Sequence, residues 1–243
     1  MMNAISIPTE KTRVTTALGD QVITLYGSPK IGKSTFASQF PDALFLATEP
    51  GLNHLEVYQV PIKDWPEFQQ VCAVVAKDPR QVKTLVIDTV DILYDHVKAH
   101  VCGLNNIQHP SDMSYGKGFS MVNGEFRRVL AKLGTLRTKG GGKMGLVIIS
   151  HAKEIEVDTR TGKQLRWAPT LPASARNIVE GMSDLLLFAD VEADGSRVIR
   201  TKPSPGWVAG DRTGRLPETM PLDHAALASA FSGDIKKGNG ESK

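Results

Sequence analysis

The run GSPKIGKST at residues 27–35 has the residue types and spacing of a phosphate-binding loop. It matches G-x-x-x-x-G-K-[ST] at every fixed position. In such a loop the glycines let the backbone curl, so that successive N–H groups point at phosphate oxygens. The Lys33 ammonium would reach the β- and γ-phosphates, and the Ser34 hydroxyl would coordinate Mg²⁺. The sequence thus predicts a site for ATP and Mg²⁺ that consists of Gly27, Ser28, Pro29, Lys30, Ile31, Gly32, Lys33, Ser34 and Thr35.

Three polar residues at the ends of other apolar runs would supply the rest of a hydrolytic site. Asp88 ends the run TLVID, the Walker B arrangement, and would hold Mg²⁺ through water while Ser34 binds the metal directly. Glu49 follows the run LFLA and would polarise the attacking water, or it is simply a turn residue before the next Pro-Gly pair. His151 ends the run LVIIS and would sense the γ-phosphate, or it lies in an ordinary strand-end turn. The candidate catalytic residues are therefore Lys33, Glu49, Asp88 and His151.

The elements that must position these residues alternate between strands and helices. The loop follows a β-branched run at 21–26, which is typical of a strand. It precedes a short helix predicted at 34–40, which ends before Pro41. The positive N-terminal end of this helix would attract phosphate. The middle strands are continuously apolar, as in a parallel sheet that helices cover on both faces. This alternation predicts a doubly wound α/β fold with a mostly parallel sheet. The predicted strands are 21–26, 43–47, 83–88, 145–150, 184–190 and 197–202, and the other predicted helices are about 64–77, 91–101, 118–138 and 222–231.

Composition predicts one soluble globular domain. The chain has 243 residues, of which 41% are hydrophobic and 23% charged. Its two cysteines form no C-x-x-C motif, and no signal pattern or long apolar run is evident, so we expect a cytoplasmic protein without a membrane partner. We expect an N-terminal arm at 1–19, an ATPase core at 20–231 and a disordered tail at 232–243.

Positive charge gathers in the second half of the chain. Residues 125–215 carry 16 Lys and Arg against 10 Asp and Glu. The stretch 152–183 is predicted to be a long basic loop with a hairpin turn at 159–162, and 103–120 a similar glycine-punctuated loop. Basic side chains with interleaved aromatic rings suit single-stranded nucleic acid, although both stretches also fit lids over nucleotide or ordinary surface. The DNA-binding candidates are Lys117, Lys153, Arg160, Lys163, Arg166, Trp167 and Arg176.

A basic strand and hairpin are predicted at residues 197–215. Positive side chains there would reach the nucleotide of a neighbouring subunit, although a surface hairpin fits almost equally well. The candidates for this role in trans are Arg200, Lys202 and Arg212.

The order of these parts resembles the RecA-type ATPase core. Within that class the chain looks like phage-encoded P-loop ATPases related to the Sak-type single-strand annealing proteins. The stretches that carry the resemblance cover about residues 20–230 and are GSPKIGKSTFA, LFLATEPG, LVIDTVDILY, IISHAKE, ARNIVEGMSDLLLF and KPSPGWVAGDRTGRLP. Two features depart from RecA itself: His151 stands where RecA has glutamine, and no N-terminal polymerisation helix is evident.

The resemblance implies a DNA-dependent ATPase that anneals or pairs single strands during phage recombination. Its partners would be single-stranded DNA, other copies of the chain in a ring or filament, and a single-strand-binding protein, all in the host cytoplasm. Nucleotide would order the DNA-binding loops. Three alternatives remain open: a helicase-loader-like ATPase that acts on a protein, a P-loop small-molecule kinase, and a binding module that does not hydrolyse ATP.

Overall fold

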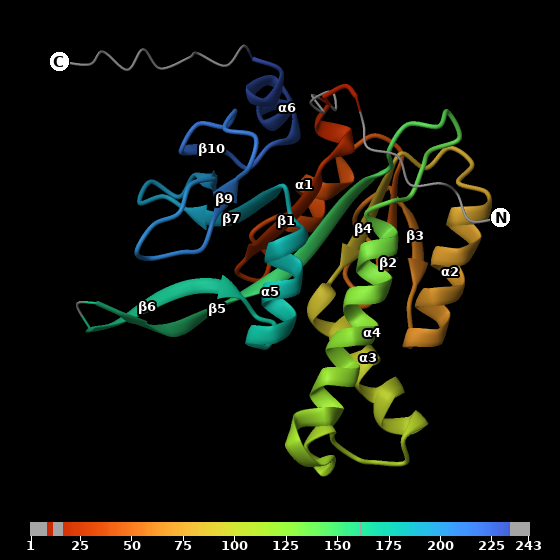
Figure 1. Ribbon diagram of the computed structural model, residues 1–243. Coiled ribbons are helices and arrows are strands. Elements are labelled where there is room, and N and C mark those ends of the chain that lie inside the picture. Colours follow the sequence, from red (N-terminus) through yellow and green to blue (C-terminus); the bar gives the residue numbers. More distant parts are fainter. Residues whose placement is uncertain (1–8, 12–16, 161, 234–243) are drawn as a thin grey trace.

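A computed structural model describes residues 9–11, 17–160 and 162–233 (Figure 1). Its centre is a ten-stranded sheet in which eight strands follow the order β10-β8-β7-β1-β5-β4-β2-β3, while β6 pairs with β5 and β9 with β7. The strands from β7 to β3 run parallel, and β6, β8, β9 and β10 add antiparallel pairs. The strands are β1 (Val22–Gly27), β2 (Ala43–Ala47), β3 (Tyr58–Pro61), β4 (Thr84–Asp88), β5 (Gly145–Thr159), β6 (Gly162–Pro169), β7 (Leu185–Val191), β8 (Arg197–Arg200), β9 (Gly210–Asp211) and β10 (Thr219–Pro221).

Helices cover both faces of this sheet, because its central strands carry apolar side chains on each face. On β5, Leu146 and Ile148 join the core beneath α2, α3, α4 and α5, whereas Val147 and Ile149 join the core beneath α1 and α6. The doubly wound, mostly parallel α/β fold is therefore confirmed. The helices are α1 (Lys33–Ser38), α2 (Trp65–Lys77), α3 (Val90–Leu104), α4 (Lys117–Leu133), α5 (Ala173–Met182) and α6 (His224–Ser232).

The predicted long loop at 152–183 is wrong. Strand β5 continues past the sheet edge to Thr159, turns, and pairs with β6 to form an antiparallel hairpin, and α5 follows. The hairpin projects from the body of the molecule in Figure 1. The prediction failed because apolar and polar residues alternate along the hairpin, as in Glu154–Asp158, so it lacks the continuous apolar run by which the central strands were found. The hairpin turn predicted at 159–162 is confirmed by the pairing of Thr159 with Gly162.

Other differences are smaller. Strand β3 at the sheet edge was not predicted, because it is only four residues long and mostly exposed, so it has no continuous apolar run. The helix predicted at 118–138 ends at Leu133. The stretch 103–120, predicted as a loop, begins inside α3, passes through two short 3₁₀ turns and ends inside α4. Most of the predicted arm, and the tail after residue 233, lie outside the described residues. Among the residues that are described, none of the helices is long and apolar enough to cross a membrane.

Candidate nucleotide-binding site

The loop between β1 and α1 has the backbone shape that phosphate binding requires. Lys30 and Gly32 both have positive φ, of 64° and 110°, so the chain reverses sharply before α1 begins. Gly27 is needed for a different reason: a Cβ there would lie 2.7 Å from the carbonyl oxygen of Ala189 on β7. The two invariant glycine positions of the motif thus serve two purposes here, a left-handed turn at Gly32 and close strand packing at Gly27.

Lys33 lies inside this loop with only 6% of its surface exposed. Its ammonium donates hydrogen bonds of 2.9 Å to the carbonyl oxygens of Gly27 and Ser28, which hold the loop closed around it. Burial lowers the pKa of Lys33, while the nearby carboxylates of Asp88, Asp91 and Glu49 oppose that shift. A buried cation with carbonyl partners on one side is placed to attract an anion from the other side.

Ser34 and Asp88 bring two oxygens together beneath the loop. The Ser34 hydroxyl donates a 2.7 Å hydrogen bond to Asp88 Oδ2. Burial raises the pKa of Asp88, and the Ser34 hydrogen bond counteracts it. One hydroxyl and one carboxylate oxygen at this position fit Mg²⁺, which usually takes few protein ligands and completes its shell with water and phosphate oxygens. Ser34 and Asp88 are therefore the residues that would hold the metal.

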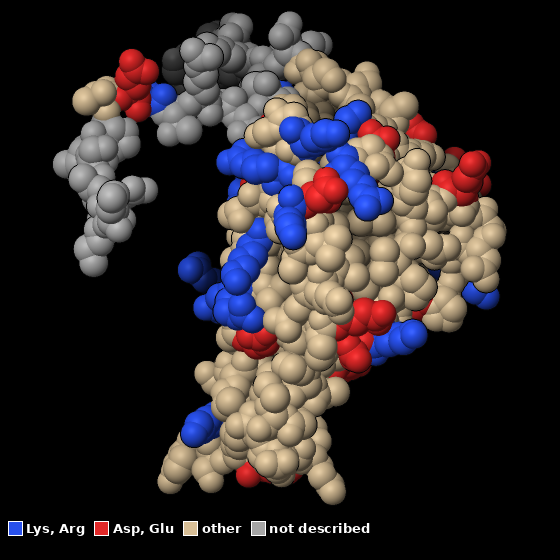
Figure 2. Space-filling model, turned by 90° about the vertical axis from the view of Figure 1, so that its right-hand side faces the viewer, with Lys and Arg blue, Asp and Glu red and all other residues tan. Residues whose placement is uncertain are grey.

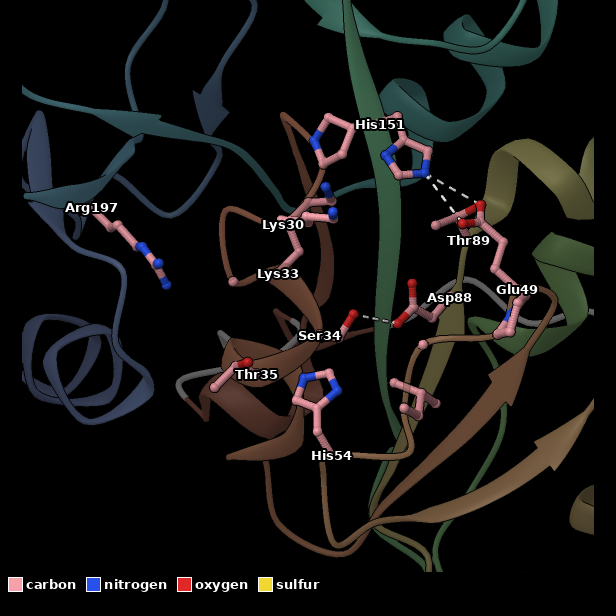
Figure 3. Close-up of a pocket in the computed structure, with 15 residues that line it drawn as sticks. Lys30, Lys33, Ser34, Thr35, Glu49, His54, Asp88, Thr89, His151 and Arg197 are labelled. Carbon is pink, nitrogen blue, oxygen red and sulfur yellow. Dashed lines mark hydrogen bonds and ion pairs between the residues drawn. The ribbon is translucent and has the colours of Figure 1, made fainter. Parts of the chain in front are cut away.

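Glu49 and His151 meet across the pocket (Figure 3). His151 Nε2 lies 3.3 Å from Glu49 Oε1, and both side chains are about one-third exposed. The Thr89 hydroxyl donates a 2.6 Å hydrogen bond to the same Glu49 oxygen. Thr48 in turn accepts from the Thr89 backbone N–H at 2.8 Å, so the end of β2 is tied to the start of α3. Glu49 and His151, which are 102 positions apart in the sequence, are therefore in contact in the folded chain.

Asp91, which sequence reasoning missed, fixes the strand that carries His151. Its carboxylate accepts hydrogen bonds from the backbone N–H of His151 at 2.9 Å and from the Ser150 hydroxyl at 2.8 Å. Burial raises the pKa of Asp91, and these two hydrogen bonds lower it. The available signal was its place in the run TVDILY, where a second carboxylate follows Asp88 by three residues.

Arg197 was also missed, although it is the first residue of β8. Its guanidinium approaches the phosphate-binding loop from the side opposite Glu49 and Asp88 (Figure 3), and a Cβ on Gly32 would lie 3.3 Å from Arg197 Nη1. No ion pair to Arg197 occurs among the described residues. The pocket has a volume of about 580 Å³, and its charged or hydrogen-bonding lining includes Lys30, Lys33, Ser34, Glu49, His54, Asp88, His151 and Arg197.

The β5–β6 hairpin separates the DNA-binding candidates onto two faces. Strand alternation and pairing place Lys153 and Arg166 on one face, together with Ile155 and Val157. The other face carries three carboxylates, Glu154, Glu156 and Asp158, beside Lys163 and Trp167. Lys163 forms an ion pair with Glu156. The first face is therefore the one that presents positive charge without acidic neighbours on the same strands.

Four of the DNA-binding candidates have contacts of their own or lie apart from that face. Trp167 stacks on Phe188 of the sheet, with ring centroids 6.4 Å apart, so one of its faces is covered. Arg176 on α5 pairs with Glu180 at 3.5 Å and is largely buried. Lys117 begins α4, whose first turn lies at the tip that projects downward in Figure 1, away from the hairpin. Arg160 follows the last residue of β5, at the hairpin end.

The candidates for a role in trans are paired within the chain. Arg200 contacts Asp190 at 3.1 Å and Glu192 at 3.0 Å, and its guanidinium lies 5.1 Å from the centroid of the Trp207 ring. The remaining two pair with carboxylates at the base of β9 and β7: Lys202 with Asp211 at 3.1 Å, and Arg212 with Asp184 at 3.6 Å. These contacts hold the segment 197–215 against the sheet.

Comparison with known proteins shows the family of this chain. The SPbeta prophage-derived uncharacterized protein YorG of Bacillus subtilis (strain 168) is 30% identical over 110 residues, which are 43% of this chain and 34% of that protein. The chain therefore spans about a third of that relative's length. The family model described as "AAA domain" matches residues 20–213, which include the loop, Glu49, Asp88, His151 and Arg197. This chain belongs to the AAA domain family of nucleotide-binding P-loop ATPases.

Proposed function

We propose that the protein hydrolyses ATP with Mg²⁺ and couples that reaction to binding of single-stranded DNA, so that it promotes strand annealing in phage recombination. The observation that carries this proposal is strand β5. It contributes His151 to the nucleotide pocket and then leaves the sheet as one arm of the basic hairpin. The similarity to a prophage-derived protein supports the phage setting, and the host cytoplasm is the compartment in which we expect it to act.

The nucleotide pocket supplies the groups that hydrolysis needs. Lys33 and Arg197 would neutralise the triphosphate from two sides, and Ser34 and Asp88 would hold Mg²⁺, which supplies charge stabilisation when it is bound. Glu49 would accept a proton from the attacking water. Thr89 orients Glu49 by its hydrogen bond, and Asp91 fixes the strand that carries His151.

The geometry of β5 supports coupling to DNA. His151 and Lys153 are two residues apart on one strand, so their side chains lie on the same face about 7 Å from one another. Arg166 lies on that same face of the hairpin. A shift of His151 on loss of the γ-phosphate would therefore tilt the face that carries Lys153 and Arg166. Because the hairpin is already a paired ribbon, this coupling is a movement of strands and replaces the ordering of loops expected from the sequence.

ATP hydrolysis with and without single-stranded DNA tests the proposal. We expect DNA to stimulate turnover, and we expect Lys33→Ala to reduce turnover by about 100-fold or more, since it removes a charge that the transition state requires. Turnover that needs a small-molecule acceptor and ignores DNA would identify a kinase. Lys33→Ala with normal nucleotide binding and turnover would contradict the assignment of the loop.

The hairpin is tested by a matched pair of variants. Lys153→Ala/Arg166→Ala removes the two cations of the face without carboxylates, and we expect the salt dependence of single-stranded DNA binding to weaken by about 1.4 in log–log slope. Lys163→Ala is the control, because Glu156 already pairs with that ammonium. Equal effects of the two variants would mean that hairpin charge in general, and not this face, holds DNA.

One observation favours a second function, in which the ATPase acts on a protein. The tip formed by the end of α3 and the start of α4 projects from the body in Figure 1 and exposes four large apolar side chains, Leu104, Tyr115, Phe119 and Met121. Exposed apolar clusters of this kind often mark protein-binding sites. A helicase-loader-like role predicts that a partner protein, and not DNA, stimulates ATP turnover, and that Tyr115→Ala/Phe119→Ala abolishes this stimulation.

A further inference from the structure

A second basic surface lies at the end of the sheet away from the nucleotide pocket. Figure 2 shows Lys and Arg side chains gathered over the upper part of the face that carries α2 and the turn after α4. We call it the strand-start surface and define it by six exposed or half-exposed cations that come from three segments, the turn after α2, the end of α4 and the turn before β5. They are Arg80, Lys83, Lys132, Arg137, Lys139 and Lys143.

The fold assembles this surface from segments that are distant in sequence. Arg137 and Lys143 face one another across an isolated antiparallel bridge, and Lys139 lies in the turn between them. A hollow of about 400 Å³ separates this turn from the segment before β4, and Arg80, Lys83, Lys139 and Lys143 all line it. Four cations from two separate segments therefore line one hollow, against two carboxylates, Asp20 and Asp42.

The negative charge of this surface lies on one side of the hollow, where Asp20 and Asp42 join its lining. Residues 127–143 contain six Lys and Arg and no Asp or Glu. Lys83 pairs with Asp42 at 2.8 Å and Arg80 with Asp78 at 3.7 Å, but no ion pair to Arg137, Lys139 or Lys143 occurs in the part of the chain that the structure describes. Like charges directly opposite one another on a ribbon are destabilising. An anion that binds between Arg137 and Lys143 would relieve that repulsion.

The strand-start surface is separate from both sites described above. It lies where β5 begins, whereas His151 is six residues further along the strand, about 20 Å away. The hairpin lies beyond His151, at the other end of the same strand. A ligand on the strand-start surface would therefore contact neither the nucleotide nor the hairpin.

We propose that the strand-start surface binds a nucleic-acid backbone, as a second site beside the hairpin. A polyanion with regularly spaced phosphates suits cations that are spread over three segments. Each cation that contacts a phosphate releases counterions from the nucleic acid, which favours binding. A membrane surface suits it less well. Amphipathic membrane-binding surfaces carry large apolar side chains beside the cations, and none of the described large exposed ones lies in segments 78–83 or 132–143. With two sites at the ends of one strand, a single molecule would hold two nucleic-acid segments at once.

The test measures binding of short labelled single strands and duplexes of one sequence, without nucleotide, across a series of salt concentrations. The variant Lys139→Ala/Lys143→Ala is compared with the control Lys63→Ala/Lys98→Ala, which removes two cations elsewhere, the exposed Lys63 and the half-exposed Lys98 that pairs with Asp95. For the single strand we expect the slope of log affinity against log salt concentration to become shallower by about 1.4. The affinity at about 0.1 M salt should then fall by about 25-fold, if the two proteins bind equally at 1 M salt. For a duplex the slope should fall by about 1.8. The two probes show which form of nucleic acid the surface prefers.

Several outcomes would overturn the proposal. Equal slopes for the two variants with both probes would show that the surface holds no phosphate. Loss of binding to vesicles rich in phosphatidylserine, with DNA binding unchanged, would assign the surface to a membrane. The hairpin variant Lys153→Ala/Arg166→Ala distinguishes this proposal from the proposal that the hairpin binds DNA. If Lys139→Ala/Lys143→Ala lowers the salt slope further when it is combined with the hairpin variant, the strand-start surface binds nucleic acid whether or not the hairpin does. Thermal unfolding of each variant checks that the exposed substitutions leave the fold intact.

Discussion

Gly27 gives the sharpest structural prediction, because the motif and the structure explain this glycine differently. The motif indicates close approach of the backbone to phosphate, whereas the structure shows close packing against Ala189. In Gly27→Ala the new Cβ would lie 2.7 Å from the Ala189 carbonyl oxygen and 2.9 Å from the Ala189 Cβ. Both atoms belong to β7, which pairs with β1 in parallel, so the two strands must separate by about half an ångström. Overpacking of this kind costs about 2–3 kcal/mol, and the smaller unfolded-state entropy of alanine returns about 0.4–1 kcal/mol. The net loss is about 1–2.6 kcal/mol, which for a chain of this length lowers Tm by about 2–10 °C.

Two measurements test this reasoning together, the melting temperature and the affinity for a fluorescent ATP analogue. We expect both to fall, because Gly27 also supplies a carbonyl oxygen to Lys33. Gly181→Ala is the matched control. No heavy atom lies within 4 Å of its new Cβ, and alanine in α5 should raise stability by about 0.5–1 kcal/mol. A Gly27→Ala variant that melts at or above the wild-type temperature would refute the packing argument. If the affinity for the ATP analogue fell and the melting temperature did not, Gly27 would be needed for the approach of the backbone to phosphate, as its motif suggests.

Three further predictions concern the charged residues of the pocket. Because burial raises the pKa of Asp88 above its ordinary value of 3.8, the folded chain holds that proton more tightly than the unfolded chain, and the free energy of unfolding falls as pH rises from about 4 through the folded pKa. Asp88→Asn should therefore unfold at higher denaturant concentration than the wild type at neutral pH while it loses Mg²⁺-dependent turnover, and lower stability at neutral pH would contradict this sign. Asp91→Ala should lower the free energy of unfolding by about 1–3 kcal/mol in denaturant titrations and also reduce turnover, since it leaves the Ser150 hydroxyl and the His151 N–H without their acceptor. Arg197→Ala should weaken ATP binding by about 10-fold or more in equilibrium titrations, and Arg197→Lys should weaken it by less, with no change in Tm for either variant. Unaltered ATP affinity would show that the guanidinium does not contact nucleotide.

The sequence determined the central part of the molecule because local signals there agree with the fold. Strands β1, β4 and the first part of β5 are buried on both faces, so they read as continuous apolar runs. The polar residues that end these runs must meet at one sheet edge, since parallel strands end together. This is why Asp88 and His151 could be placed near the phosphate-binding loop from spacing alone, and the loop itself is a contiguous motif.

Only the tertiary structure decided the features that depend on contacts between distant segments. Arg197 reaches the loop because β8 follows β7 in the sheet, and nothing in its local sequence distinguishes it from Arg200, which is neutralised by two carboxylates. The split of the hairpin into an acidic and a basic face depends on the register between β5 and β6. The strand-start surface likewise needs three separate segments to converge. Charge composition alone indicated a polyanion partner, but it is the folded chain that separates the positive charge into two surfaces, because register and strand order set which side chains become neighbours.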